Sequence, residues 1–140
     1  MPDEPVKGPT VVCSAFIEKE KKFMLLFCPR FKVWRLPGGR VEFDEILEGT
    51  LKREMKEELG IAISEPKFLG YGQDHQFQVR DQKETSRLLI FFHVKTDKEP
   101  TVDPNEAEEY KWATIEEIKK EQNKEGALTD FFNRNPDIKF

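Results

Sequence analysis

The sequence has few of the residues that mark zinc-binding, disulfide-rich or membrane-spanning proteins. It contains two cysteines and two histidines in 140 residues. Cys13 and Cys28 both lie within apolar runs and lack the close Cys/His spacing of a zinc site. No stretch reaches the roughly 18 apolar residues of a membrane span, and residues 1–9 are polar, without the apolar core of a signal peptide. We therefore expect two buried free thiols, no membrane partner, a flexible N-terminus over residues 1–9 and a cytoplasmic location.

An excess of positive charge is also missing. The chain has 23 basic and 27 acidic residues, a formal net charge of -4, which disfavours duplex nucleic acid as the partner. A mildly acidic chain repels polyphosphates, so a nucleotide site would need bound cations or a local cluster of Arg and Lys. Hydrophobic residues make up 37% and charged residues 36%, which predicts one globular domain over residues 1–140 with a densely and oppositely charged surface.

The hydrophobic pattern predicts an α/β (α+β) fold with a mixed central sheet. Residues 10–17 and 23–28 are nearly continuous apolar runs around a charged turn, which indicates a hairpin in a sheet covered by helices on both faces. Residues 34–39, which contain Pro and paired Gly, are expected to form a tight loop. Further strands are expected at residues 61–63, 67–71, 76–79, 86–95 and 110–113, of which 86–95 is the central one.

Three helices are predicted. The first spans residues 43–59, with Asp44 as its N-cap and Gly60 at the position after the last turn that favours a left-handed residue. Thr114 opens a second, short helix with a capping-box pattern. Residues 126–133 have apolar side chains at helical spacing and form the third.

The first predicted helix carries a cluster of acidic residues beside its apolar face. At about 100° per residue, four apolar side chains form a single stripe toward the core: Leu47, Leu51, Met55 and Leu59. The same geometry places Glu58 inside the stripe, Glu54 just outside its edge and Glu57 further out. A solvated, salt-bridged helix is the ordinary explanation for such charges. Three carboxylates converging within one turn beside a core instead favour a hard divalent cation with oxygen ligands.

A longer pattern contains this cluster: Gly, five residues, Glu, seven residues, Arg-Glu, an aliphatic residue, any residue, Glu-Glu, any residue, Gly and an aliphatic residue. Every position is filled, by Gly39, Glu45, Arg53, Glu54, Met55, Glu57, Glu58, Gly60 and Ile61. This pattern is the Nudix box, and the chain resembles the MutT-like Nudix hydrolases. Residues 36–38 before the box and Trp112-Ala113 after it are also similar to family features, whereas Thr50-Leu51 replaces two residues that are usually small.

The resemblance implies a Nudix fold, an α/β/α sandwich with a catalytic loop-helix-loop. It also implies hydrolysis of a phosphoanhydride in a nucleoside diphosphate linked to another group, with Mg²⁺ as cofactor and Mn²⁺ as the alternative. Glu54, Glu57 and Glu58 match the family's metal ligands, often joined by the backbone carbonyl of Gly38 or Gly39. Gln at position 57 or 58 is expected to cut the rate by orders of magnitude. Relief of carboxylate repulsion should leave the metal-free variant folded or somewhat stabilised.

Other residues of the box and a later loop have less certain roles. Arg53 is expected to hold a neighbouring carboxylate bidentately. Glu45 either supports the site through metal-bound water or compensates the helix dipole. The general base is left open between Glu54 and the later loop, where Glu106 is favoured as base or extra ligand and Glu109 comes next.

Substrate contacts are assigned from position and chemistry. Arg35 and Arg87 are preferred to Arg30 for a phosphate or sugar, because they adjoin the glycine loop and the central strand. Phe77 is the aromatic candidate for stacking on a base, although an aromatic residue in a strand is more often part of the core.

Three functions are weighed. The leading prediction is hydrolysis of a nucleoside triphosphate or related nucleotide, a small-molecule partner. A nucleotide-sugar or dinucleoside polyphosphate hydrolase is the second, and a non-catalytic nucleotide- or RNA-binding module the third. The complete set of Glu ligands and the low basic charge argue against the third. Residues 70–86 and 97–109 are expected to select the substrate, and the oligomeric state is left open, with a homodimer as one candidate.

Overall fold

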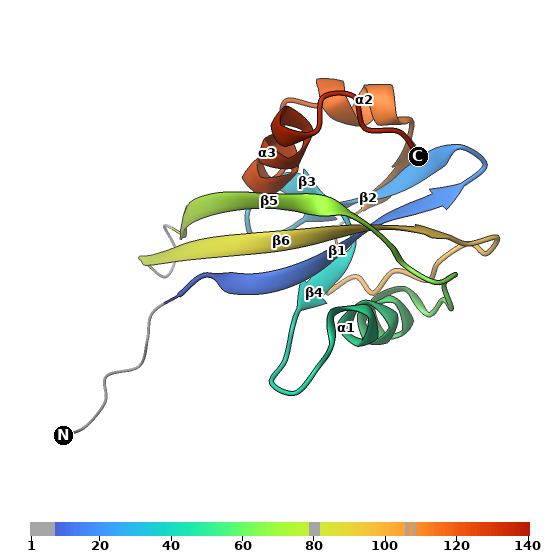
Figure 1. Ribbon diagram of the computed structural model, residues 1–140, viewed down its shortest axis with the longest axis horizontal. Coiled ribbons are helices and arrows are strands. Elements are labelled where there is room, and N and C mark those ends of the chain that lie inside the picture. Colours follow the sequence, from blue (N-terminus) through green and yellow to red (C-terminus); the bar gives the residue numbers. More distant parts are fainter. Residues whose placement is uncertain (1–7, 79–81, 106, 108) are drawn as a thin grey trace.

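The computed structural model describes residues 8–78, 82–105, 107 and 109–140, and its strands form one mixed sheet (Figure 1). Within these residues the sheet has the order β3-β2-β1-β6-β5, with β4 paired to β1 and β7 to β2. The strands are β1 (Thr10–Lys19), β2 (Lys22–Cys28), β3 (Val33–Arg35), β4 (Gly38–Arg40), β5 (Lys67–Gln78), β6 (Lys83–Lys95) and β7 (Tyr110–Ala113). β1 and β6 are parallel and β1 and β2 antiparallel, so the predicted hairpin and the mixed sheet are confirmed.

Helices cover both faces of the sheet. The helix α1 (Leu47–Glu54) and its π-helical continuation η1 (Met55–Leu59) lie on one face (Figure 1). The helices α2 (Ile115–Lys120) and α3 (Gly126–Arg134) lie on the other. This arrangement is the α/β/α sandwich that was expected. No helix in the described part of the chain is long and apolar enough to cross a membrane.

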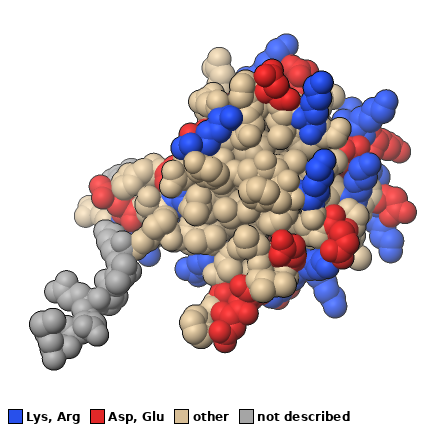
Figure 2. All heavy atoms as spheres, viewed as in Figure 1, with Lys and Arg blue, Asp and Glu red and all other residues tan. Residues whose placement is uncertain are grey.

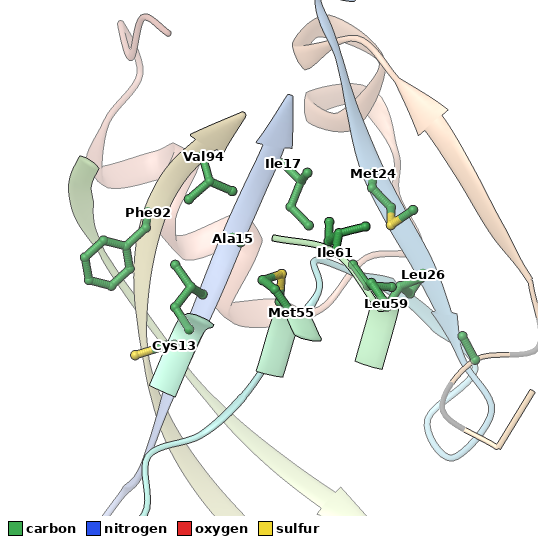
Figure 3. Close-up of a cluster of buried hydrophobic side chains, with 12 residues drawn as sticks. Cys13, Ala15, Ile17, Met24, Leu26, Met55, Leu59, Ile61, Phe92 and Val94 are labelled. Atoms are coloured by element: carbon green, nitrogen blue, oxygen red, sulfur yellow. The ribbon is translucent and has the colours of Figure 1, made fainter. Parts of the chain in front are cut away.

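Alternate residues of the inner strands pack into two different hydrophobic cores, one on each face of the sheet. On β1, Cys13, Ala15 and Ile17 pack toward α1 and η1 (Figure 3). Phe16, which points to the opposite face, packs against Phe131 of α3 with ring centroids 5.5 Å apart. Successive side chains of a strand point to opposite faces. Because both faces are buried, these strands show no alternation of apolar and polar residues.

The acidic helix is anchored by its apolar stripe. Leu51, Met55 and Leu59 are fully buried against the sheet, and Leu47 packs partly against the same cluster. Figure 3 shows Met55 and Leu59 in this cluster. Full burial of each large side chain contributes roughly 1.5–3 kcal/mol. The predicted orientation of the stripe is confirmed, and its packing fixes the side of the helix on which the flanking carboxylates lie.

The predicted start of this helix is wrong by a few residues. The helix begins at Leu47 with Ile46 at the N-cap position, and Asp44 lies in the preceding turn with φ of 74°. The carboxylate of Glu45 accepts hydrogen bonds from the backbone N–H of Glu42 and the hydroxyl of Thr50, and these bonds stabilise a turn where a helix was expected. The predicted end is confirmed, since Gly60 is left-handed with φ of 67°.

Two strand predictions also need correction. Residues 61–63 form no strand, and residues 67–71 and 76–79 belong in large part to one long strand, β5, with a bulge between Phe68 and Gly70. The polar stretch that suggested a break is paired in register with β6, because the hairpin backbone supplies hydrogen bonds whatever the side chains are. Residues 110–113 form β7, and Thr114 makes the predicted capping box with Glu117.

The surface is charged in both signs, as the composition predicts. Figure 2 shows acidic and basic side chains interspersed around this face of the molecule, with uncharged atoms across its middle. Both cysteines are free, and Cys13 is buried. Cys28 is only half-buried, against expectation, because it lies at the end of β2 where a pocket opens.

The segment expected to be a tight loop is built from two short strands around Leu36 and Pro37. Gly38 and Gly39 belong to β4 and pair with Ser14 and Cys13 of β1. A Cβ at position 38 would lie 2.0 Å from the carbonyl oxygen of Cys13. Gly38 therefore lacks a side chain because two strands approach closely here. A pair of glycines in a sequence is equally typical of a turn, so the sequence alone does not distinguish the two.

Gly38→Ala is expected to lower the free energy of unfolding by about 1–3 kcal/mol or more, because the methyl group has to displace the backbone of β1. Urea denaturation followed by circular dichroism measures the effect. Gly49→Ala is the matched control. Its Cβ in α1 would meet only a side-chain carbon of Ile46, at 3.4 Å, so stability should hold or rise by up to about 1 kcal/mol. Equal stability of the two variants would contradict the close contact.

Candidate active site

The three box glutamates differ in burial in the order that the helix geometry predicts. The exposed fraction of the side chain is 3% for Glu58, 20% for Glu54 and 63% for Glu57. Helical periodicity alone ranks them, because the core contact of the apolar stripe fixes the rotation of the helix. These three glutamates are called the acidic edge below. They extend from the protein interior, at Glu58, to the solvent, at Glu57.

Arg53 lies at the centre of this edge and donates hydrogen bonds to three carboxylates, with a fourth, that of Glu42, 3.7 Å away. Its Nε and Nη2 donate to the two oxygens of Glu45 at 2.7 and 2.9 Å. Its Nη1 donates to Glu54 at 2.8 Å and to Glu57 at 3.2 Å. The hydrogen bonds from Arg53 lower the pKa of Glu45 to about 2, so this carboxylate stays charged at neutral pH. One planar guanidinium therefore sets the spacing of the acidic groups.

The most buried glutamate has its own arginine. Arg35, on β3, donates from Nη2 to Glu58 Oε1 at 2.7 Å and from Nη1 to the carbonyl of Leu36 at 3.1 Å. Burial alone would lower the pKa of Arg35, but the charge of Glu58 and their hydrogen bond raise it, so the guanidinium stays charged. This ion pair connects the helix that carries the glutamates to β3, the strand that precedes the glycines.

The sequence predicted that the three glutamates converge on one point, and in the described residues they do not. Among the described residues, no three His, Cys, Asp or Glu side chains are grouped closely enough to hold a metal ion. The guanidiniums of Arg53 and Arg35 stand between the acidic groups instead, because opposite charges at hydrogen-bond distance offset carboxylate repulsion.

The donor set nevertheless fits a hard divalent cation. Glu45, Glu54, Glu57 and Glu58 bring four carboxylates to one side of the helix, where Arg53 and Arg35 bind them. A Cβ at Gly39 would lie 2.1 Å from the carboxyl carbon of Glu54, so this carboxylate rests directly on the Gly39 backbone. Carboxylate and carbonyl oxygens are the ligands that Mg²⁺ and Mn²⁺ prefer.

A pocket of about 310 Å³ opens beside the glycines. Gly38, Gly39 and Arg35 form its wall toward the acidic edge, and Gln76 and Arg87 lie among its other lining residues. A second hollow of about 690 Å³ shares Gln76 and Arg87 with the first. Because the two share lining residues, they are neighbours, one at the glycines and one over the β5–β6 hairpin, and together they are called the cleft below.

Arg35 and Arg87 were predicted to bind the substrate, and both reach this cleft, but each is already paired. Arg87 donates to Asp74 at 2.9 and 2.6 Å and to Glu125 at 3.1 Å. Burial raises the pKa of Glu125, while the charge of Arg87 and a hydrogen bond from the Leu36 backbone act in the opposite direction. This network shapes the wall of the pocket, and the role of the two arginines toward the substrate stays a prediction.

Two other arginines lie at the rim of the cleft. Arg30 and Arg40 line both hollows and are exposed. Neither forms an ion pair with any residue that the structure describes. Arg40 was missed at the sequence level, although its place directly after the glycines is a signal that finds it. Arg30 was weighed and ranked below Arg35 and Arg87, and that order stays a prediction.

The remaining candidates are only partly visible. Glu106 lies outside the described residues, and so does the side chain of Phe77. Glu109 is exposed, and its backbone carbonyl accepts a hydrogen bond from Phe27 at 2.8 Å. Asn105 and Gln76, from the two segments expected to select the substrate, both line the pocket. No sequence signal pointed to Gln76 or to Glu125.

An α/β/α sandwich in which a glycine strand leads to a helix edged with three glutamates is the architecture of a Nudix hydrolase. The comparison with family models agrees, because the model described as the NUDIX domain matches residues 7–131. The chain belongs to the Nudix family and is an enzyme of the Nudix hydrolase type.

Individual relatives are distant but match over most of the chain. The CTP pyrophosphohydrolase of Escherichia coli (strain K12) is 30% identical over 112 residues, which cover 76% of each chain. The 8-oxo-dGTP diphosphatase of Buchnera aphidicola subsp. Schizaphis graminum is 26% identical over 101 residues, 72% of this chain and 66% of the relative. The crystal structure of the MutT protein from Methanosarcina mazei Go1 is 27% identical, with a TM-score of 0.77 over 93% of this chain and 95% of the other.

Proposed function

We propose that this chain hydrolyses a phosphoanhydride bond of a nucleoside triphosphate or a related nucleotide, in a reaction that depends on Mg²⁺ or Mn²⁺. The observation that carries the proposal is the junction of acidic edge and pocket: Glu54 rests on the Gly39 backbone, which lines the pocket. Relatives named as a CTP pyrophosphohydrolase and an 8-oxo-dGTP diphosphatase support this substrate class.

In the proposed reaction, water adds to one phosphorus atom, the bridging P–O bond breaks, and pyrophosphate or phosphate leaves. Glu54, Glu57, Glu58 and the Gly38 or Gly39 carbonyl would hold the cation, which supplies charge neutralisation and activation of water. Arg53 keeps the carboxylates in place. The proton lost by water passes to a carboxylate, for which Glu54 is the described candidate.

We assign the phosphate contacts of the substrate to Arg30 and Arg40. Arg30→Ala and Arg40→Ala are each expected to raise KM by about 10-fold, since each removes a charge-assisted hydrogen bond, with kcat much less affected. Steady-state kinetics with varied nucleotide measures both parameters. Arg134→Ala is the matched control, because this arginine pairs with Asp130 on α3 and does not line the cleft. An unchanged KM in both rim variants would reject the assignment.

The proposed function itself is tested with a substrate panel. Nucleoside triphosphates, nucleotide sugars and dinucleoside polyphosphates are incubated with the protein and Mg²⁺, and every product is identified. Release of pyrophosphate or phosphate from a nucleoside triphosphate, abolished by EDTA and restored by Mg²⁺, is the expected result. Turnover confined to nucleotide sugars or dinucleoside polyphosphates moves the assignment to that class. Tight binding of a nucleotide without turnover of any compound sinks the enzymatic proposal.

A further inference from the structure

One residue that lines the pocket beside the glycines has a buried side-chain oxygen to which no described residue donates a hydrogen bond. Gln76 lies on β5, opposite Thr85 of β6, and lines the pocket. Its side-chain oxygen Oε1 is shielded from solvent and accepts no hydrogen bond from any described residue. Buried acceptors almost always have a partner, so an orphaned one on a pocket wall points to a group that a ligand supplies.

The buried ion pairs beside Gln76 do not satisfy its oxygen, because their hydrogen bonds join other residues. Arg87 is bound to Asp74 and Glu125. Glu125 accepts from Arg87 with one oxygen and from the backbone N–H of Leu36 with the other. No described donor therefore reaches Gln76 Oε1, and a ligand that satisfies this oxygen has to bring an N–H or O–H group.

The position of this acceptor suits a nucleobase and not a phosphate. A phosphate oxygen is an acceptor and would be repelled by Oε1, whereas the exposed guanidiniums of Arg30 and Arg40 at the rim attract it. The pocket volume of about 310 Å³ is at the small end of the range for ligand sites, which fits one base and its sugar.

We propose that Gln76 Oε1 accepts a hydrogen bond from an exocyclic amino group of the base, so that the site selects amino-bearing bases over their keto counterparts. This inference rests on the proposed function and names the group within the pocket that discriminates among nucleotides. Cytosine and uracil are the matched pair, because they have the same size and differ only at two adjacent ring positions. Cytosine has an amino group at C4 beside an unprotonated N3, and uracil has a carbonyl at C4 beside an N3–H. At C4, uracil would set two acceptors against each other.

Two substitutions of Gln76 distinguish a hydrogen bond to the base from an effect of side-chain size. The amide of Gln76 can rotate and present its N–H₂, so it tolerates some uracil. Gln76→Glu keeps the size and is only an acceptor when ionised, so it should keep or increase the preference for cytosine. Gln76→Leu fills similar space without a hydrogen-bonding group, so it should remove the preference. Any general effect on nucleotide affinity cancels in the ratio of the two substrates.

The experiment compares kcat/KM for CTP and UTP with Mg²⁺ in the wild type, Gln76→Glu, Gln76→Leu and Gln73→Leu. The last variant is the matched control, since Gln73 lies on the same strand, is exposed and does not line the cleft. A wild-type preference for CTP of about 10-fold or more is expected, retained in Gln76→Glu and Gln73→Leu and lost in Gln76→Leu. A wild-type ratio near one, or an unchanged ratio in Gln76→Leu, overturns the inference while leaving hydrolysis intact.

Binding provides an independent readout that does not need turnover. CMP and UMP are titrated into metal-free wild-type protein and the same variants, and amide chemical shifts are followed by NMR. Tighter binding of CMP, lost only in Gln76→Leu, supports the inference even if no triphosphate is hydrolysed. Equal binding, or no binding of either, overturns it. If Gln76→Leu does not fold, the wild-type and Gln76→Glu ratios decide by the same criteria.

Discussion

Glu57→Gln is expected to lower kcat/KM by more than about 100-fold while leaving the protein folded. Residues that only orient a metal ligand cost about 10–100-fold when removed, and Glu57 is assigned as a ligand itself. Its side chain is 63% exposed and meets Arg53 at 3.2 Å, an interaction of little weight for stability. The loss should therefore appear in kinetics and Mg²⁺ titrations, with an unchanged urea midpoint in EDTA.

Glu48→Gln is the matched control for this prediction. Glu48 is an exposed residue of α1, so the substitution removes a charge of the same sign from the same helical segment, at a position that the box leaves unspecified. Activity should stay within about twofold of wild type, because surface substitutions away from a site change little. Equal loss in the two variants would mean that general charge on the helix is responsible, and wild-type activity in Glu57→Gln would reject its assignment as a ligand.

The same substitution at Glu58 has a different expected outcome. From the sequence, relief of carboxylate repulsion predicts a folded or stabilised metal-free protein. The structure reverses this expectation, because Glu58 is buried and its partner Arg35 would be left without a full negative charge. Glu58→Gln should lose activity and also unfold at lower urea concentration than Glu57→Gln. Higher stability than wild type in EDTA would show that repulsion, not the pair with Arg35, dominates.

What the sequence predicted about the site depends on local periodicity. The apolar stripe fixes which side of the helix faces the sheet, and this rotation determines the burial of Glu54, Glu57 and Glu58. The two glycines gave the right place but the wrong conformation, since a residue without a side chain suits a turn and a close strand contact equally well.

Which arginine pairs with which carboxylate could not be predicted from the sequence, for a different reason. Arg35 and Glu58 are 23 residues apart, and Arg87 and Glu125 are 38 residues apart. No local pattern says which acidic group an arginine will meet, because that depends on the order of strands in the sheet. The assignment of Arg35 and Arg87 to the substrate followed from their neighbourhood along the chain, where their carboxylate partners could not be seen.

Arg53→Lys is expected to reduce kcat/KM by about 10–100-fold, although the charge is kept. The guanidinium uses three nitrogens to reach Glu45, Glu54 and Glu57 at once, and a single ammonium cannot reproduce that geometry. Glu54 and Glu57 would then lose their fixed spacing. We expect the Mg²⁺ concentration for half-maximal activity to rise as well, which a purely structural role of Arg53 would not produce.

Arg134→Lys is the matched control for this change. It makes the same substitution at an arginine that also contacts a carboxylate four residues away, Asp130, on a helix at the other face of the sheet. Activity and Mg²⁺ dependence should remain those of the wild type, because an exposed pair of this kind contributes little. If Arg53→Lys also keeps its Mg²⁺ dependence, charge alone suffices at this position. The branched geometry of the Arg53 guanidinium would then have no part in holding the cation.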